Sequence, residues 1–277
     1  MEKLEDSRHL YLDLMKRCLV NMIYPQAEEV PLPATATGFR DRLARVLLKD
    51  EGGSGRISAT QSGDHLGRME GRIWPVVAHT MIGLKRLDNL EFCVEQVIAK
   101  EVSGDLIETG VWRGGTTIFM RAVLKAYGVT DRRVWVADSF EGLPPPDTAK
   151  YPRDADSDLH KARELAVSLE EVKTNFDRYG LLDDQVRFLK GWFRDTLPIA
   201  PVERLAVLRL DGDMYGSTMD TLVNLYPKLS KGGYVIVDDY GAIPACRQAV
   251  NDYRSANGIS EEICEIDWTG IFWQKGN

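Results

Sequence analysis

The stretch Asp105-Leu-Ile-Glu-Thr-Gly110-Val-Trp-Arg-Gly-Gly115-Thr116 joins a short apolar run to a glycine-rich turn. Because glycine adopts backbone conformations that other residues avoid, Gly110, Gly114 and Gly115 indicate a tight turn after a strand. An amphipathic segment starts at about Thr116 and continues to residue 127, which predicts a helix. A strand, a glycine turn and a helix together form the first unit of an α/β fold.

The same alternation continues to the end of the chain. It predicts an α/β fold with a doubly wound, mostly parallel, Rossmann-like sheet of seven strands, because strand–helix–strand crossovers place consecutive strands in parallel. Two final runs joined by Asp267-Trp-Thr269 read as an antiparallel edge hairpin. The predicted strands cover residues 105–110, 134–138, 186–189, 206–210, 234–237, 262–266 and 270–274, and the later helices cover residues 169–179, 219–229 and 245–254.

Residues 1–100 are predicted to form a helical extension before the main domain at 101–277. Apolar spacing indicates helices at 10–20 and 84–97. Between them, a Gly/Ser-rich stretch at about 50–72 is typical of a mobile surface loop.

Composition excludes several classes of function. The chain has 277 residues, 44% of them hydrophobic, and a net charge of -7 without a dense basic cluster, which argues against a nucleic-acid partner. No apolar stretch approaches the roughly 20 residues that span a bilayer. The charged N-terminus does not resemble a secretion signal, and four widely spaced cysteines indicate a reducing compartment. We therefore expect a cytoplasmic protein without a membrane partner.

The tips of the first two predicted strands carry acidic residues that suit S-adenosylmethionine. Ligands of doubly wound sheets bind beyond the carboxyl ends of the strands. There, Glu108 would repel a pyrophosphate but attract an ammonium, and Asp138 beside Ser139 can accept hydrogen bonds from ribose hydroxyls. The dinucleotide spacing G-x-G-x-x-G is missing, which disfavours NAD. A plain strand-to-helix turn is the alternative.

Other residues near these tips are candidates for the same cofactor. Arg113 either meets the cofactor carboxylate or forms a surface ion pair, and Trp192 and Phe193 either flank the adenine or belong to the core. The predicted cofactor-binding residues at the strand tips are Glu108, Thr109, Gly110, Arg113, Gly114, Gly115, Thr116, Asp138, Ser139, Trp192 and Phe193.

Asp211, Asp238 and Asp239 follow two strands that we expect to be neighbours. Carboxylates placed close together repel one another unless they are protonated or neutralised, and oxygen-only ligands favour Mg²⁺, or Mn²⁺, over zinc. The cation would stabilise a developing alkoxide while Asp211 acts as ligand and general base. The oxygen would then attack the sulfonium methyl in line. Alternatively, Asp213 or Asp239 caps a helix, and His160 is another candidate base.

With these residues placed, the chain resembles the macrocin O-methyltransferase family, over nearly its whole length. The resemblance rests on long motifs. Besides the glycine-rich run they are Leu10-Tyr-Leu-Asp-Leu, Ala78-His-Thr-Met-Ile-Gly83, Trp135-Val-Ala-Asp-Ser-Phe140, Tyr179-Gly-Leu-Leu-Asp-Asp-Gln-Val-Arg-Phe188, Gly191-Trp-Phe193, Leu210-Asp-Gly-Asp213 and Asp238-Asp-Tyr240.

The resemblance implies a class I S-adenosylmethionine methyltransferase that methylates sugar hydroxyls of glycosylated natural products such as macrolides and aminocoumarins. It implies Mg²⁺ ligation by Asp211, Asp238 and Asp239, with Asp211 as the base. It also implies that Thr80 and Met81 enclose the cofactor and that residues 140–168 form a lid. The Gly/Ser-rich stretch at 52–71 is longer than the family pattern leads us to expect, in a region that should help shape the acceptor pocket.

Three other functions compete with this hypothesis. A catechol-type O-methyltransferase would use the same metal chemistry on a phenolic acceptor, and the sequence separates the two poorly. An NAD-dependent dehydrogenase lacks its glycine pattern, and a non-catalytic binding module does not explain the three carboxylates. The N-terminal helices lead us to expect a homodimer.

Overall fold

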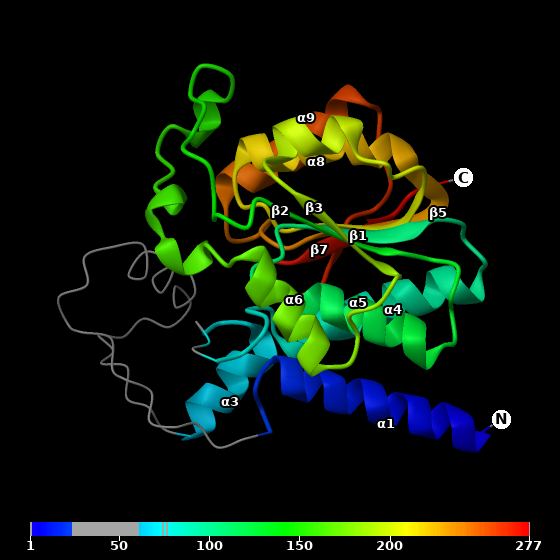
Figure 1. Cartoon of the computed structure of the whole chain (residues 1–277). Helices are drawn as coiled ribbons and strands as arrows, with labels where there is room; N and C mark the ends of the chain where they lie inside the picture. Colours follow the sequence, from blue (N-terminus) through cyan, green and yellow to red (C-terminus); the bar gives the residue numbers. More distant parts are fainter. Residues whose placement is uncertain (1, 24–60, 74, 76, 277) are drawn as a thin grey trace.

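The computed structural model describes residues 2–23, 61–73, 75 and 77–276. At its centre lies a seven-stranded sheet with the order β3-β2-β1-β4-β5-β7-β6 (Figure 1). Strands β1 to β5 are parallel, whereas β7 runs antiparallel to β5 and β6. The predicted fold class is therefore confirmed. The strands are β1 Asp105–Thr109, β2 Val134–Asp138, β3 Val186–Lys190, β4 Leu205–Leu210, β5 Leu229–Val237, β6 Cys264–Glu265 and β7 Ile271–Gln274.

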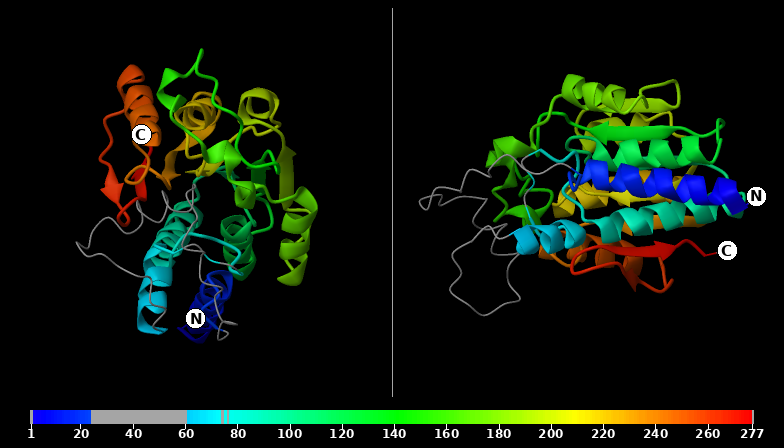
Figure 2. Two further views of the ribbon diagram at one scale, coloured as in Figure 1. Left: turned by 90° about the vertical axis from the view of Figure 1, so that its left-hand side faces the viewer. Right: turned by 90° about the horizontal axis from the view of Figure 1, so that it is seen from below.

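Helices cover both faces of the sheet, which explains why its central strands are buried along nearly their whole length. Helices α4, α5 and α6 lie on one face with α1 outside them, and α8 and α9 lie on the other (Figures 1 and 2). Leu12 and Leu19 of α1 are fully buried in the same core as α4 and α5. The helices are α1 Glu2–Leu19, α3 Gln61–Glu70, α4 Leu84–Ala99, α5 Gly115–Ala126, α6 Leu169–Arg178, α7 Phe193–Thr196, α8 Tyr215–Leu225 and α9 Pro244–Ala256.

The helix predicted at 219–229 is displaced by four residues in the structure. Helix α8 ends at Leu225, because Pro227 lacks the N–H that a continuing helix needs and lies in a short 3-10 turn at Tyr226–Lys228. Strand β5 then starts at Leu229, where it pairs with Leu205, and is longer than the predicted 234–237.

Part of the predicted mobile loop is helical, so that prediction was wrong for residues 61–70, which form α3. The Arg68 side chain of this helix donates hydrogen bonds to the carbonyls of Val20 and Asn21 at 2.9 and 3.2 Å. Gly67 is a packing residue, since a Cβ there would lie 2.5 Å from Ile73 Cγ2. Residues 50–60 of the predicted loop lie outside the described residues.

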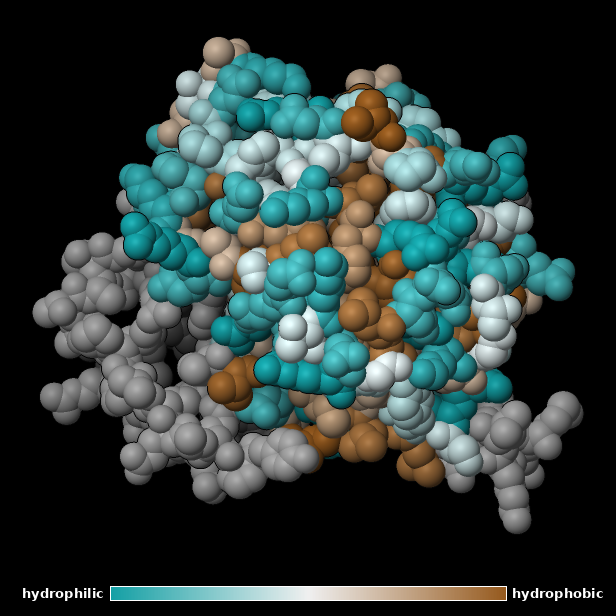
Figure 3. All heavy atoms as spheres, in the orientation of Figure 1, coloured by the Kyte–Doolittle hydropathy of each residue, from teal (hydrophilic) through white to brown (hydrophobic). Residues whose placement is uncertain are grey.

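The face of the molecule in Figure 3 is mostly hydrophilic, with apolar residues in its centre and along its lower edge. Leu10 and Leu14 of α1 are 65% and 52% exposed. The expected homodimer, for which these side chains would offer a contact, stays a prediction. Among the described helices, none is both long and apolar enough to cross a bilayer.

Candidate functional site

A cavity of about 650 Å³ opens at the carboxyl ends of all five parallel strands. This position is typical of ligand sites in doubly wound sheets. Each strand contributes a residue at or just after its last position. These residues are Gly110, Asp138, Gly191, Asp211 and Asp238.

Gly110, after β1, has a φ of +89°. A Cβ at Gly110 would lie 1.9 Å from the Asp211 carbonyl oxygen, so only glycine fits between the tips of β1 and β4. Gly115 is equally constrained, because a Cβ would lie 2.4 Å from the His79 carbonyl, which accepts the Gly115 N–H at 2.9 Å. These glycines therefore let chain segments approach one another.

Asp138, at the tip of β2, uses both carboxylate oxygens to hold the neighbouring loops. Oδ2 accepts the N–H of Val111 at 2.8 Å, and Oδ1 accepts the N–H of Phe140 at 2.7 Å. Burial raises the pKa of Asp138, although these hydrogen bonds oppose the shift. The carboxylate is thus fixed in the cavity wall.

The structure brings most of the predicted cofactor residues to this wall. Five other predicted residues are not among the described residues that line the cavity. Two of these five are charged, and each has a protein partner. Arg113 donates to the Ala78 carbonyl at 2.9 Å, and Glu108 pairs with Arg209. The predicted residues in the wall are Thr80, Met81, Gly110, Thr116, Asp138, Ser139, Trp192 and Phe193. The predicted residues away from it are Glu108, Thr109, Arg113, Gly114 and Gly115.

Glu108 is 1% exposed and lies under the strand tips. Its Oε1 accepts a hydrogen bond from Arg209 Nη1 at 2.5 Å, and Oε2 has no partner among the described residues. Burial raises the pKa of Glu108 to about 8, against the opposing charge of Arg209. The structure thus gives Glu108 an arginine partner, whereas the sequence had suggested the cofactor ammonium.

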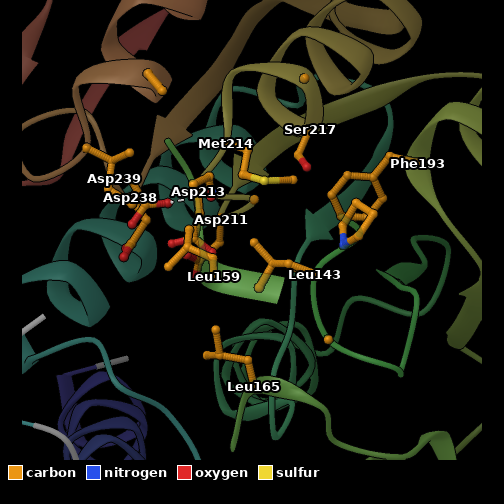
Figure 4. A pocket seen from close by; sticks show the side chains of 18 of the residues that line it. Leu143, Leu159, Leu165, Phe193, Asp211, Asp213, Met214, Ser217, Asp238 and Asp239 are labelled. Carbon is orange, nitrogen blue, oxygen red and sulfur yellow. Dashed lines mark hydrogen bonds between the residues drawn. The ribbon is translucent and has the colours of Figure 1, made fainter. Parts of the chain in front are cut away.

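Asp211, Asp238 and Asp239 come together as predicted. Each offers one carboxylate oxygen, and these oxygens lie within 4.8 Å of one another. Figure 4 shows them with Asp213 at one side of the cavity, opposite Phe193. Burial, and then the charge of Asp238, raise the pKa of Asp211 to about 6. Burial and the charge of Asp213 raise the pKa of Asp239 well above its usual value.

Two buried arginines behind this cluster were missed by the sequence analysis. Arg209 donates to Asp211 Oδ2 at 2.7 Å and to Asp238 Oδ1, and Arg86 donates to Asp238 Oδ2. Burial alone would raise the pKa of Asp238, but the charges of Arg86 and Arg209 offset this and leave it below its usual value. A lone arginine inside the apolar strand 205–210 was the available signal, because such a charge requires buried partners.

The segment predicted as a lid lies against the cavity and contacts α8. It contains 3-10 turns at Pro152–Asp154, Leu159–Lys161 and Arg163–Leu165. Asp154 is 2% exposed and accepts the N–H groups of Tyr215 and Gly216, both at 2.8 Å, so it caps the helix that follows Asp211 and Asp213. His160, the alternative base, lies outside the described wall of the cavity.

Comparison with known proteins agrees with this architecture. The family model described as Macrocin-O-methyltransferase (TylF) matches residues 8–275. The chain is similar to 8-demethyl-8-(2,3-dimethoxy-alpha-L-rhamnosyl)-tetracenomycin-C 4'-O-methyltransferase of Streptomyces olivaceus, with 57% identity over 98% of this chain and 94% of the relative. It is also similar to mycinamicin III 3''-O-methyltransferase of Micromonospora griseorubida, with 52% identity over 96% of both chains.

Solved structures of methyltransferases are also similar to this chain. The O-methyltransferase NovP superposes with a TM-score of 0.82 and 49% identity, covering 98% of this chain and 100% of NovP. The calicheamicin methyltransferase CalS11 shares the fold at a TM-score of 0.59 and 17% identity, over 92% and 99% of the two chains. A cavity at the tips of a mixed seven-stranded sheet, a family model that spans the chain and relatives above half identity lead to one conclusion: this chain belongs to the macrocin O-methyltransferase family.

Proposed function

We propose that this chain transfers a methyl group from S-adenosylmethionine to a sugar hydroxyl of a glycosylated natural product, using Mg²⁺ held by Asp211, Asp238 and Asp239. One observation carries the proposal. In a chain that belongs to an O-methyltransferase family, three carboxylates converge in the cavity at the tips of β4 and β5.

The carboxylates suit a hard divalent cation. Their donor atoms are all oxygen, which favours Mg²⁺ over softer metals. Burial, and then the charges of neighbouring carboxylates, raise the pKa values of Asp211 and Asp239, although Arg86 and Arg209 already pair with Asp238. A cation would offset the charges of these carboxylates.

S-adenosylmethionine suits the part of the cavity at the tips of β1, β2 and β3. Oδ1 of Asp138 accepts the Phe140 N–H and, at 3.4 Å, the Ser139 hydroxyl, and Oδ2 accepts the Val111 N–H. A ribose hydroxyl can donate a further hydrogen bond to this carboxylate. Trp192 and Phe193 add aromatic surface to the same cavity, which Thr80 and Met81 also line. We therefore assign these residues to the cofactor.

The reaction needs an activated hydroxyl and an in-line methyl donor. Asp211, Asp238 and Asp239 would hold Mg²⁺, whose Lewis acidity would lower the pKa of an acceptor hydroxyl. Because Oδ2 of Asp211 accepts a hydrogen bond from Arg209, we assign proton uptake to Oδ1. S-adenosylmethionine held at the tips of β1, β2 and β3 would supply the methyl group, and the acceptor oxygen would take it as the carbon–sulfur bond breaks, with S-adenosylhomocysteine as the leaving product. The remaining contribution of the protein is positioning.

The names of the relatives favour a sugar acceptor. The tetracenomycin enzyme acts on a rhamnosyl derivative. A third relative is demethyldecarbamoylnovobiocin O-methyltransferase of Streptomyces niveus, which is 51% identical over 96% of this chain and 93% of its own length. A catechol-type acceptor remains the second candidate, because the carboxylate cluster would activate a phenol in the same way.

An acceptor panel separates the two candidates. It contains the glycosides named for the three relatives and a simple catechol, each supplied with methyl-labelled S-adenosylmethionine and Mg²⁺. We expect at least one glycoside to be methylated, with NMR locating the new methyl on a sugar oxygen. Methylation of the catechol alone would contradict the sugar assignment.

A further inference from the structure

The turn Asp267-Trp268-Thr269, which connects β6 to β7, borders the carboxylate cluster. Strand β7 runs antiparallel to β5, and Ile271 pairs with Val237, so the start of β7 lies beside the end of β5. Trp268 and Thr269 line the same cavity as Asp238 and Asp239. The turn thus forms part of the cavity wall beyond β5.

This turn is fixed to the residues of the site. Oδ1 of Asp267 accepts the N–H of Thr269 at 3.0 Å, and its Oδ2 accepts Arg86 Nε at 3.0 Å. The Thr269 hydroxyl donates to the Asp238 carbonyl at 2.9 Å. On the other side, a Cβ at Gly241 would lie 2.3 Å from the Trp268 carbonyl. These contacts therefore fix the position of the turn relative to Asp238.

The Trp268 side chain is anchored as well. Its indole Nε1–H donates to the Glu70 carbonyl at 2.9 Å, at the end of α3. The Arg72 guanidinium lies 4.8 Å from the centre of its ring. Because the one polar atom of the indole is satisfied by protein, what the ring can offer to the cavity is apolar aromatic surface.

The order of the strands divides the cavity into two parts. The tips of β1, β2 and β3 form the part that we assign to S-adenosylmethionine. The tips of β4 and β5 carry the carboxylates, and the turn with Trp268 lies beyond them at the edge of the sheet. An acceptor whose hydroxyl reaches Asp211 must place the rest of its sugar on the side away from the cofactor.

We propose that Trp268 is a specificity-determining residue that packs against the apolar face of the acceptor sugar ring. The C–H face of a pyranose is apolar, whereas its hydroxyls project around the edge, so an anchored aromatic ring suits it. Because Glu70 already holds the ring and Arg86 holds the turn, little conformational entropy is lost when the sugar binds. This inference rests on the proposed function, because it assumes a glycoside acceptor.

The test measures binding rather than turnover. The glycosides of the acceptor panel are titrated by calorimetry into the full-length protein with S-adenosylhomocysteine and Mg²⁺. Trp268→Ala is compared with Trp268→Phe and with Trp192→Ala, which alters the cofactor side. We expect Trp268→Ala to raise the Kd for the glycoside by about tenfold or more and to change the Kd for S-adenosylhomocysteine by less than about twofold. Trp268→Phe should recover most of the lost affinity, and Trp192→Ala should show the opposite pattern.

Three results would overturn the role of Trp268. One is a glycoside Kd for Trp268→Ala within about twofold of the wild type, and a second is an equal loss of affinity for the cofactor product and the glycoside. A third, equal loss in Trp268→Phe and Trp268→Ala, would show that the hydrogen bond to Glu70 matters and the ring face does not. Glycoside binding that depends on Trp268 but gives no methyl transfer would instead refute the proposed function.

Discussion

Asp211→Asn is expected to lower kcat for methyl transfer by about 10²–10⁴-fold, the range over which a positioned general base accelerates proton transfer. The substitution keeps the size of the side chain but removes the charge that we assign both to Mg²⁺ and to the acceptor proton. Asparagine can still face Arg209 through its amide oxygen, so the fold should survive. Initial rates with saturating cofactor and glycoside measure the effect.

Asp131→Asn serves as the matched control, since Asp131 is exposed and precedes β2 at the opposite end of the sheet. It should leave kcat unchanged. An Asp211→Asn enzyme as active as this control would exclude Asp211 from catalysis. Binding of S-adenosylhomocysteine to both variants shows whether the cavity is intact.

Arg209→Met is expected to destabilise the protein by about 3–5 kcal/mol, the cost of removing one partner from a buried ion pair. Arg209 is 1% exposed and donates to Glu108, Asp211 and Asp238, and methionine would leave these carboxylates without their common cation. Urea unfolding followed by circular dichroism measures the change in the free energy of unfolding.

Arg187→Met on β3 provides the comparison. Because Arg187 is only half-buried, this substitution should lower the free energy of unfolding by less than about 1 kcal/mol. Equal destabilisation by Arg209→Met and Arg187→Met would contradict the proposed electrostatic role of Arg209.

Local sequence patterns were sufficient for the sheet and for the residues at its tips. Buried parallel strands are short apolar runs, and the residue that ends each run must lie at the cavity, which placed Asp138, Asp211 and Asp238 correctly. The sequence analysis identified the glycines as part of a turn, but it missed the structural reason why glycine is required there. Gly110 is required by the carbonyl of Asp211, which lies a hundred residues away in the chain.

Contacts between distant segments could not be predicted in this way. Arg86 and Asp267 are separated by 181 positions, and neither belongs to a motif that indicates the other. The same holds for Glu108, whose charge suited an ammonium until the neighbouring strand supplied Arg209. Helix α3 was taken for a loop because its glycines were counted as flexible, whereas Gly67 is needed for close packing against Ile73.

In the proposed reaction, the carboxylates at the tips of β4 and β5 hold a divalent cation that activates a sugar hydroxyl. The most direct measurement is methyl transfer to the best glycoside of the panel after treatment with EDTA, followed by titration with Mg²⁺. Transfer is expected to fall to background in EDTA and to return with Mg²⁺ in the wild type, but not in Asp211→Asn. Full transfer by the cation-free enzyme would show that the carboxylates do not act through a cation.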